Sequence, residues 1–242
     1  MNKKDLDQQS QHWENSFSSK PEMFGLDPSE PARHAKEIFE NQKVNIFFKR
    51  KKIDILELGA GLGRDTTYLA ANSNLIQVTA LDYSSEAIRN INKKKIEYHS
   101  DPTMPDGRSA ADKITTKVWD VRNGIPYKDN SFDGCYSHML YCMAFTTSEI
   151  IKLNKEVHRI LKPGGINIFT VRHTGDGDYK KGKHIGEDLY KNDGFIVHFF
   201  DKEKINQISK GFEIEDIFEL YEGSFPRKLF VVTQRKKRIW NF

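Results

Sequence analysis

The sequence predicts a single α/β domain with a doubly wound, mostly parallel sheet, an antiparallel closing strand and a helical extension at its N-terminus. From residue 53 onward, short apolar runs alternate with stretches of helical periodicity, and no repeat or long linker divides the 242 residues. This alternation is typical of a sheet covered by helices on both faces, where buried strands are apolar almost throughout. The runs that fit are 53–58, 75–81, 114–119, 132–137 and 165–171.

Capping signals and apolar spacing predict helices between these strands. One helix covers 64–71, and another begins at Ser84. A third begins at Thr146, because Thr146 and Glu149 have the spacing of a capping box and apolar residues recur after them at helical intervals. The run Lys-Pro-Gly-Gly at 162–165 should end this helix, since proline cannot continue it and glycine favours the turn.

The ends of the chain and one central segment differ from this pattern. Two late strands, 212–221 and 227–234, are expected to pair antiparallel and close one end of the sheet, and helices are expected at 4–17 and 29–48. The boundaries that follow are 1–50 for a helical extension or lid, 51–235 for the main domain, 172–200 for an insertion on the substrate side, and 236–242 for a basic tail.

Composition excludes several classes of protein. The 38 Lys and Arg residues exceed the 34 Asp and Glu residues by only four, and the basic clusters are scattered among acidic residues, so a nucleic-acid partner is not expected. No run approaches the ~18 apolar residues that span a bilayer, and no apolar run follows the start, so neither a membrane nor a secretory signal is expected. Two cysteines favour a reducing cytoplasm. A monomer or homodimer is expected.

The first strand runs directly into a glycine-rich loop that contains Gly59, Gly61 and Gly63. Glycines let the backbone turn sharply and approach a ligand, and the following helix offers free N–H groups. The next strand leads to Asp82, about 20 residues further on, where an acidic side chain would bind ribose hydroxyls. Dinucleotide enzymes have a further glycine where this loop has Arg64, so the loop departs from their pattern, and a nucleotide ligand stays open as an alternative.

Three later motifs follow in order. The third strand leads to Asp120, the fourth is Ser-Phe-Asp-Gly-Cys-Tyr-Ser at 131–137, and Leu-Lys-Pro-Gly-Gly at 161–165 precedes the fifth. With these motifs the chain resembles the class I, Rossmann-like methyltransferases that use S-adenosylmethionine (SAM), over about 53–171 and the closing strand pair. The resemblance implies a methyl transfer from SAM, which leaves S-adenosylhomocysteine (SAH).

The resemblance also implies roles for individual residues. The loop would wrap the methionine part of the cofactor, an acid before it would orient the loop or the amino group, and later strand ends would hold the ribose and adenine. The residues that the resemblance assigns to the cofactor are Glu57, Gly59, Ala60, Gly61, Gly63, Asp82, Tyr83, Asp120, Val121 and Ser137.

Candidate acceptor-side residues follow from chemistry and from position near strand ends. His138, just past the fourth strand, is the candidate catalytic base. Aromatic faces near the sulfonium can stabilise its charge, and Phe17 and Tyr136 are candidates for this role together with Trp13 and Tyr141. No His-x-His or His-x-x-x-His spacing supports a metal, so none is expected. For each residue, ordinary packing or a surface ion pair stays open. The substrate candidates are Trp13, Tyr141, Arg172, His173, His198 and Arg227.

A closer likeness and a thiol site are weaker inferences. The N-terminal Trp-Glu-Asn at 13–15 and the Pro-rich segment 21–31 resemble the tellurite-resistance and thiopurine-type small-molecule methyltransferases. Cys135 and Cys142 flank one strand end and would suit a soft acceptor such as arsenite, although burial is the preferred interpretation for both.

The predicted function is methyl transfer from SAM to a small-molecule thiol, chalcogen, oxygen or nitrogen nucleophile. Two alternatives stay open. An RNA- or protein-directed methyltransferase would use the same cofactor site, and a non-catalytic module would bind SAM or a nucleotide without turnover.

Overall fold

The computed structural model describes residues 3–20, 23–41, 52–100, 107–192, 194–223 and 227–237. Its main sheet runs in the order β3-β2-β1-β4-β5-β10-β9, parallel from β3 to β5, with β10 antiparallel to both of its neighbours. The predicted doubly wound sheet with antiparallel closing strands is therefore confirmed. The strands are β1 (Ile53–Leu58), β2 (Ile76–Asp82), β3 (Ile114–Val118), β4 (Phe132–Ser137), β5 (Leu161–His173), β9 (Phe212–Glu222) and β10 (Arg227–Lys236).

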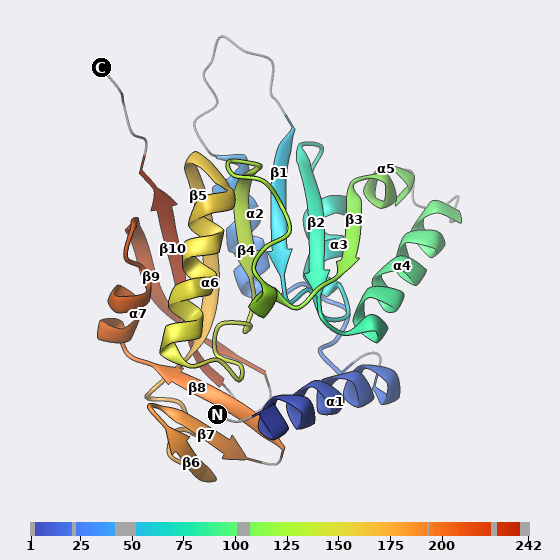
Figure 1. The fold of residues 1–242 in the computed structure, drawn as a ribbon. Helices are drawn as coiled ribbons and strands as arrows, with labels where there is room; N and C mark the ends of the chain where they lie inside the picture. The colour runs from blue at the N-terminus through green and yellow to red at the C-terminus, as the bar shows by residue number, and fades with distance from the viewer. Residues whose placement is uncertain are drawn as a thin grey trace.

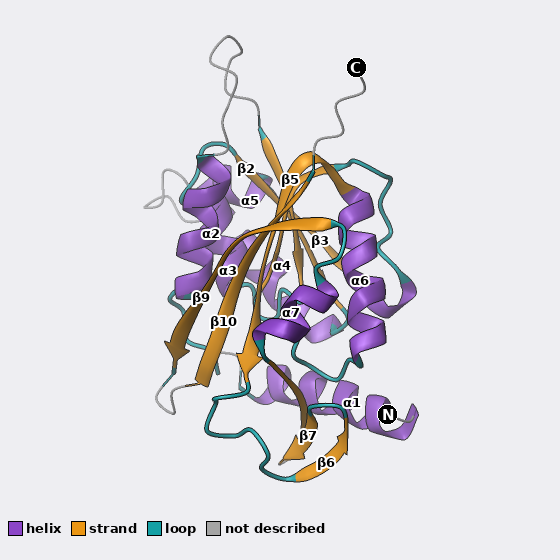
Figure 2. Cartoon of the chain, turned by 90° about the vertical axis from the view of Figure 1, so that its left-hand side faces the viewer, coloured by secondary structure: helices purple, strands orange, loops and turns teal. Residues whose placement is uncertain are grey.

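Helices cover both faces of this sheet (Figure 2). α2 (Glu30–Glu40), α3 (Arg64–Ala71) and α4 (Ser85–Ser100) pack on one face, and the short α5 (Gly107–Asp112) lies beside α4. α6 (Thr147–Ile160) and α7 (Lys202–Ile208) pack on the other face, so the molecule has three layers and two apolar cores.

Strand β1 shows why a buried parallel strand is apolar almost throughout. Ile53 and Ile55 pack into the core under α2 and α3, whereas Leu56 and Leu58 pack into the core under α6. Successive side chains of a strand point to opposite faces, and both faces of this strand are covered.

The carboxyl ends of the parallel strands meet at one edge, and two further elements lie across that edge (Figure 1). The chain order reverses between β1 and β4, which makes their ends the switch point where ligands of open α/β sheets bind. α1 (Lys3–Ser19) and an antiparallel ribbon lie below these ends. The ribbon strands are β6 (Lys183–Gly186), β7 (Leu189–Asn192) and β8 (Phe195–Phe200), and β8 joins the end of β5.

The structure corrects several predicted boundaries. β5 begins at Leu161 rather than at residue 165, because Leu161 is already extended and aligns with Phe132 of β4. The predicted helix at 29–48 ends at Glu40, where Asn41 caps it, and 42–48 lie outside the described residues. The ribbon and the short helices α5 and α7 were not predicted. None of the helices in the described ranges is long and apolar enough to cross a bilayer.

Candidate cofactor and acceptor site

Two adjoining cavities lie at the carboxyl edge of the sheet. The larger has a volume of about 460 Å³ and the smaller about 270 Å³. They share part of their walls, so one elongated ligand can occupy both. The shared residues are Trp13, Gly59, Asp82, Tyr83, Leu140 and Met143.

The glycine loop forms the floor between β1 and α3. Gly59 and Gly63 have φ values of 69° and 77°, a left-handed conformation that favours glycine. A Cβ on Gly63 would lie 2.5 Å from the Ile91 side chain, so glycine also permits the close packing of the loop against α4. The loop is tied to β2, because the N–H groups of Gly59 and Ala60 donate to the Leu81 carbonyl.

Asp82 lines both cavities and is nearly buried. Its carboxylate accepts one hydrogen bond from the Gly61 N–H and one from the Ser84 N–H, each at 2.9 Å. Burial raises the pKa of Asp82 to about 6, although the backbone hydrogen bonds oppose that change. The carboxylate therefore binds the glycine loop and keeps further acceptor capacity toward the cavities.

Glu57 lines the larger cavity at the end of β1. It is 3% exposed and accepts a hydrogen bond from the Thr66 hydroxyl at 2.5 Å. Burial, together with the nearby charge of Asp65, raises the pKa of Glu57 well above its usual value. A positively charged ligand group beside Glu57 would favour the ionised form of this carboxyl group, so the position suits a cationic partner.

The smaller cavity is a slot lined largely by the loops after β2 and β3. Tyr83, Trp119, Asp120 and Val121 all line it. Asp120 accepts the N–H of Arg122 at 2.9 Å and caps a short turn, which fixes its position. A flat ring with an exocyclic amino group would meet aromatic faces and a carboxylate acceptor in this slot.

A chain of polar contacts crosses the larger cavity. Arg64 donates to the Phe24 carbonyl at 2.7 Å and to one oxygen of Glu222 at 2.9 Å, and the other oxygen of Glu222 lies 3.0 Å from His138 Nε2. His138 Nδ1 lies 3.0 Å from the Thr170 hydroxyl. Burial raises the pKa of Glu222, but the hydrogen bonds and charges of His138 and Arg64 outweigh burial and lower it to about 2.

These contacts place a proton on His138 Nε2. The Glu222 carboxylate can only accept, so Nε2 carries a proton and donates it. The Thr170 hydroxyl accepts the N–H of Met139 at 2.8 Å and lies 3.0 Å from His138 Nδ1. Both ring nitrogens of His138 are therefore engaged in this structure.

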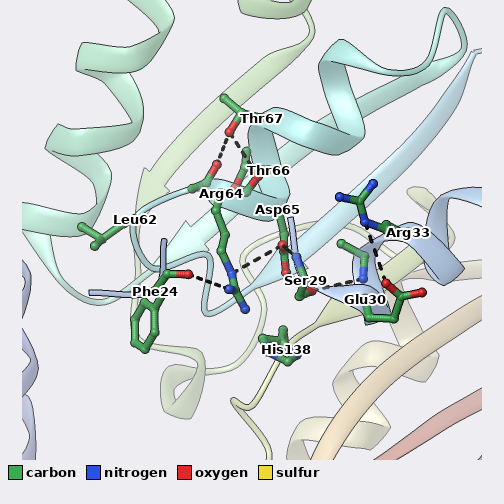
Figure 3. Close-up of polar contacts among 12 residues, drawn as sticks. Phe24, Ser29, Glu30, Arg33, Leu62, Arg64, Asp65, Thr66, Thr67 and His138 are labelled. Atoms are coloured by element: carbon green, nitrogen blue, oxygen red, sulfur yellow. Dashed lines mark hydrogen bonds and ion pairs between the residues drawn. The ribbon is translucent and has the colours of Figure 1, made fainter. Parts of the chain in front are cut away.

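A second polar cluster anchors the N-terminal segment to the glycine loop. Asp65 accepts hydrogen bonds from the N–H and the hydroxyl of Ser29, and from the hydroxyl of Tyr136 at 2.9 Å. All three residues are buried. Figure 3 shows Asp65 and Arg64 side by side, with Arg64 directed to the Phe24 carbonyl. The contacts hold Phe24 against the cavity, so side chains distant in sequence fix its wall.

The structure brings most of the predicted residues together. Of the cofactor candidates, Gly63 and Ser137 do not line either cavity: Gly63 packs beneath the loop, and Ser137 is fully buried. The candidates that line a cavity are Glu57, Gly59, Ala60, Gly61, Asp82, Tyr83, Asp120 and Val121, with Trp13, Phe17, His138, Arg172 and Arg227 on the acceptor side.

Three of the substrate candidates line neither cavity. Tyr141 is fully buried and stacks on Phe169 with ring centroids 4.5 Å apart. His173 stacks on Phe230 and its Nε2 lies 3.2 Å from Glu219. These rings pack within the structure, and the sequence did not reveal which face of its strand or loop each side chain takes.

His198 is the third candidate that lines neither cavity. It is fully buried, donates from Nδ1 to the Phe145 carbonyl at 2.8 Å, and accepts at Nε2 from Lys204 at 2.9 Å. Burial and the Lys204 charge lower its pKa to about 4, so it is neutral near pH 7. Tyr136 is likewise buried and bonds Asp65 rather than facing a cavity.

The cysteines do not form an acceptor site. Cys135 and Cys142 are both buried, and neither lines a cavity. Burial raises the pKa of Cys142 to about 11, so its thiol is protonated near pH 7. Within the described ranges, no group of three or more His, Cys, Asp or Glu side chains is arranged to hold a metal ion.

Several cavity residues were not singled out from the sequence. Glu222 comes from the end of β9, far along the chain, and Leu140 contacts the position of a Cβ on Gly59 at 3.1 Å. The replacement of a fingerprint glycine by Arg64 was visible in the sequence, but its partner Glu222 was not. No local pattern marks a contact between residues 158 positions apart.

Comparison with known proteins finds matches for the central segment of the chain. Residues 56–169 match a family profile described as "Methyltransferase domain". The chain is 27% identical over 158 residues to 24-methylenesterol C-methyltransferase 2 of Arabidopsis thaliana, and 26% identical over 158 residues to the enzyme of that name from Oryza sativa subsp. japonica. Each match covers 64% of this chain but only 38% of the plant enzyme.

Solved structures share the fold at low identity. A 1,6-didemethyltoxoflavin-N1-methyltransferase from Burkholderia thailandensis, solved with that compound and SAH, is 17% identical, with a TM-score of 0.67 over 96% of this chain and 88% of that one. The N-methyltransferase NodS from Bradyrhizobium japonicum, solved with SAH, is 13% identical, with a TM-score of 0.63 over 94% of this chain and 98% of that one.

Proposed function

We propose that the protein transfers the methyl group of SAM to a small-molecule acceptor, because residues 56–169 match a methyltransferase domain profile. One observation carries the proposal. The glycine loop, Asp82 and Asp120 come from three successive strand ends and surround two cavities that share a wall. That arrangement suits one ligand with a charged tail, a ribose and a flat base.

The lining residues would hold the cofactor in one direction. Tyr83, Trp119 and Asp120 would bind the adenine in the slot, and Asp82 at the junction would accept hydrogen bonds from the ribose hydroxyls. The glycine loop would bind the methionine part in the larger cavity, and Glu57 would pair with its ammonium group. Residues of the loop, of α1 and of the ribbon then exclude water around the sulfonium.

The transfer is an in-line displacement at the methyl carbon. A lone pair of the acceptor forms the new bond to carbon while the carbon–sulfur bond breaks. Its electron pair stays on sulfur, which becomes the neutral thioether of SAH. The protein's contribution is to align the acceptor and to accept a proton where the acceptor carries one.

His138 is proposed to accept that proton together with Glu222 rather than alone. Both of its ring nitrogens are hydrogen-bonded, one to Glu222 at 3.0 Å, so imidazole and carboxylate form one unit at the cavity wall. The proton from the acceptor goes to this pair, whose net charge rises by one unit. Replacing His138 by Gln should therefore lower kcat for acceptors with an O–H or N–H and leave thiolate acceptors less affected.

Calorimetric titration with SAM and SAH tests the cofactor assignment. The wild-type protein should bind both, and Asp82→Ala should lose at least ~30-fold in affinity, because a buried carboxylate that accepts two ribose hydroxyls contributes ~1.5–3 kcal/mol per charge-assisted bond. Asp129→Ala is the matched control, since Asp129 is exposed and pairs with Arg159 away from both cavities. Failure of the wild-type protein to bind either compound contradicts the proposal.

An acceptor screen decides between the proposed function and its alternatives. SAH release with thiols, chalcogen oxyanions, phenols, amines or sterols supports a small-molecule methyltransferase, and sterols enter because the curated relatives are named for them. Labelling of bulk RNA or of a protein lysate would instead support a macromolecular acceptor. SAM binding without turnover on any acceptor would favour a non-catalytic module.

The remaining assignments are part of the same proposal. We expect the segment 1–50 to act as a helical extension or lid and 172–200 to be the acceptor-side insertion. Most of the basic tail expected at 236–242 lies outside the described residues. We propose a cytoplasmic monomer or homodimer. The likeness to tellurite-resistance and thiopurine-type enzymes stays a prediction from the sequence.

A further inference from the structure

The acceptor end of the larger cavity has an aromatic wall made by two ribbon strands. On β8, Phe195, Val197 and Phe199 line the cavity, while the residues between them are buried in the cores on the other side. On β7, Tyr190 and Asn192 line it, and they pair directly with Val197 and Phe195. Paired residues share a face, so these side chains form one continuous surface.

α1 adds further rings to this surface. Trp13 meets Phe195 edge-to-face, with ring centroids 5.2 Å apart, and Phe17 lies 5.3 Å from Trp13. Both α1 rings line the cavity. Aromatic faces on adjoining walls favour a planar, apolar ligand, because such a ligand stacks on them and removes apolar surface from water.

Two of the cationic side chains beside this wall are paired with carboxylates, and a third is not. Arg172 is 4% exposed and forms ion pairs with Asp176 and Asp178, and Lys181 approaches the same Asp178 at 3.8 Å. Arg227 also lines the cavity and is exposed to solvent, and its guanidinium forms no ion pair or hydrogen bond with any residue that the structure describes.

The carboxylate of Glu222, opposite Arg227 in the sheet, does not pair with its guanidinium. The two residues are aligned across β9 and β10. The oxygens of Glu222 are already bound by Arg64 and His138, at 2.9 Å and 3.0 Å. The guanidinium of Arg227 is therefore accessible to an incoming ligand and keeps its donors for it.

From these contacts we propose that the acceptor is an aromatic carboxylate, whose ring stacks on the wall formed by Tyr190, Phe195 and Phe199 and whose carboxylate is bound by Arg227. Arginine suits this role because its planar fork can donate two parallel hydrogen bonds to a carboxylate. Fixing the ring at one end and the anion at the other would orient a ring substituent toward the methyl group. The inference rests on the proposed function, since it places this acceptor beside SAM.

Binding to the SAH-loaded protein tests the inference without requiring turnover. Hydroxybenzoates, indole carboxylates and quinoline carboxylates are titrated by calorimetry, each beside its methyl ester, together with a sterol in detergent. At least one acid should bind tenfold or more tightly than its ester. Arg227→Gln should weaken that acid at least tenfold and leave the ester within twofold, and Arg227→Lys should recover part of the loss.

Lys228→Gln is the matched control. Lys228 follows Arg227 on β10, but it pairs with Glu219 at 2.7 Å and does not line the cavity. This variant should bind acids and SAH as the wild-type protein does. The inference is overturned if no acid binds, if esters or the sterol bind as tightly as acids, or if Arg227→Gln weakens acid and ester alike. Failure of the wild-type protein to bind SAH would instead contradict the proposed function.

Discussion

The cofactor side and the acceptor side of this site are built in different ways. The proposed cofactor side consists of three successive strand ends, a glycine loop, Glu57 and two aspartates, all within 57–121. The acceptor side combines α1, the ribbon, and the ends of β9 and β10, whose residues are separated by as many as 214 positions between Trp13 and Arg227. The first is held mainly by backbone geometry and the second mainly by side-chain contacts.

This difference has a consequence for what each side tolerates. A loop fixed by positive φ values and backbone hydrogen bonds accepts few substitutions, because a side chain would strain or displace it. A wall of side chains on strands can change residue by residue while the backbone keeps its place. Variants should therefore affect folding and SAM binding on one side, and acceptor choice on the other.

The largest effect is expected for Gly63→Ala. Gly63 has a φ of 77°, and its Cβ would lie 2.5 Å from Ile91. Left-handed strain of ~1–2 kcal/mol and overpacking of ~1–3 kcal/mol should together lower the free energy of unfolding by about 2–5 kcal/mol. Gly25→Ala is the control, because Gly25 has a φ of 73° with nothing within 4 Å, and only the strain remains. Equal losses in urea unfolding for both variants would show that packing against α4 is unimportant.

The next effect separates the acceptor side from the cofactor side. Val197→Phe adds bulk to the ribbon wall beside Tyr190, and displacing an acceptor by about 1 Å can cost on the order of 100-fold in rate. We expect kcat/KM for the acceptor to fall ~10- to 100-fold, while the affinity for SAM stays within twofold. Val197→Thr, which preserves the shape, should remain within about threefold. A parallel loss of SAM affinity would mean that the two sides are not separable.

A smaller effect should appear in the pH dependence of Asp82. Its pKa is raised to about 6 in the folded protein, so the carboxyl is protonated below that pH and accepts ribose hydroxyls less well. SAM affinity should therefore fall, by about tenfold per charge-assisted bond lost, as the pH drops from 7 to 5. Titration of Asp82→Asn across the same range should show no such fall.

The same raised pKa predicts an opposite trend for stability. Because the folded-state pKa of Asp82 exceeds its ordinary value of 3.8, the folded apo protein binds this proton more tightly than the unfolded chain. The free energy of unfolding of the wild-type protein relative to Asp82→Asn should thus decrease as the pH rises from about 4 to 6, and level off above 6. A flat difference in urea unfolding across this range contradicts the assignment.

The smallest effect is expected at Tyr141, which the sequence had placed near the acceptor. Its hydroxyl makes only long hydrogen bonds, at 3.3 Å, to Asn154 and Asn167 in the core. Tyr141→Phe should cost ~1 kcal/mol of stability or less and leave SAM affinity and kcat within twofold. A tenfold loss of kcat with unchanged stability would instead show that Tyr141 contributes to the acceptor site.

The sequence by itself determined the cofactor side. Glycine spacing, Asp82 and Asp120 are local patterns at strand ends, and parallel strands bring consecutive ends to the same edge. The capping box at Thr146 and the antiparallel closing pair were predicted for the same reason, since each depends on residues near one another in the chain.

Most of the acceptor side was decided by the tertiary structure, although the sequence had offered Trp13, Arg172 and Arg227 as candidates. The ribbon at 183–200 was predicted only as an insertion, and His198 and Phe199 are neighbours in sequence that face opposite sides of β8, one into the core and one into the cavity. Which face is buried depends on what packs against the strand. The bond between Arg64 and Glu222 likewise exists only because β9 returns to the glycine loop, and no local pattern encodes that return.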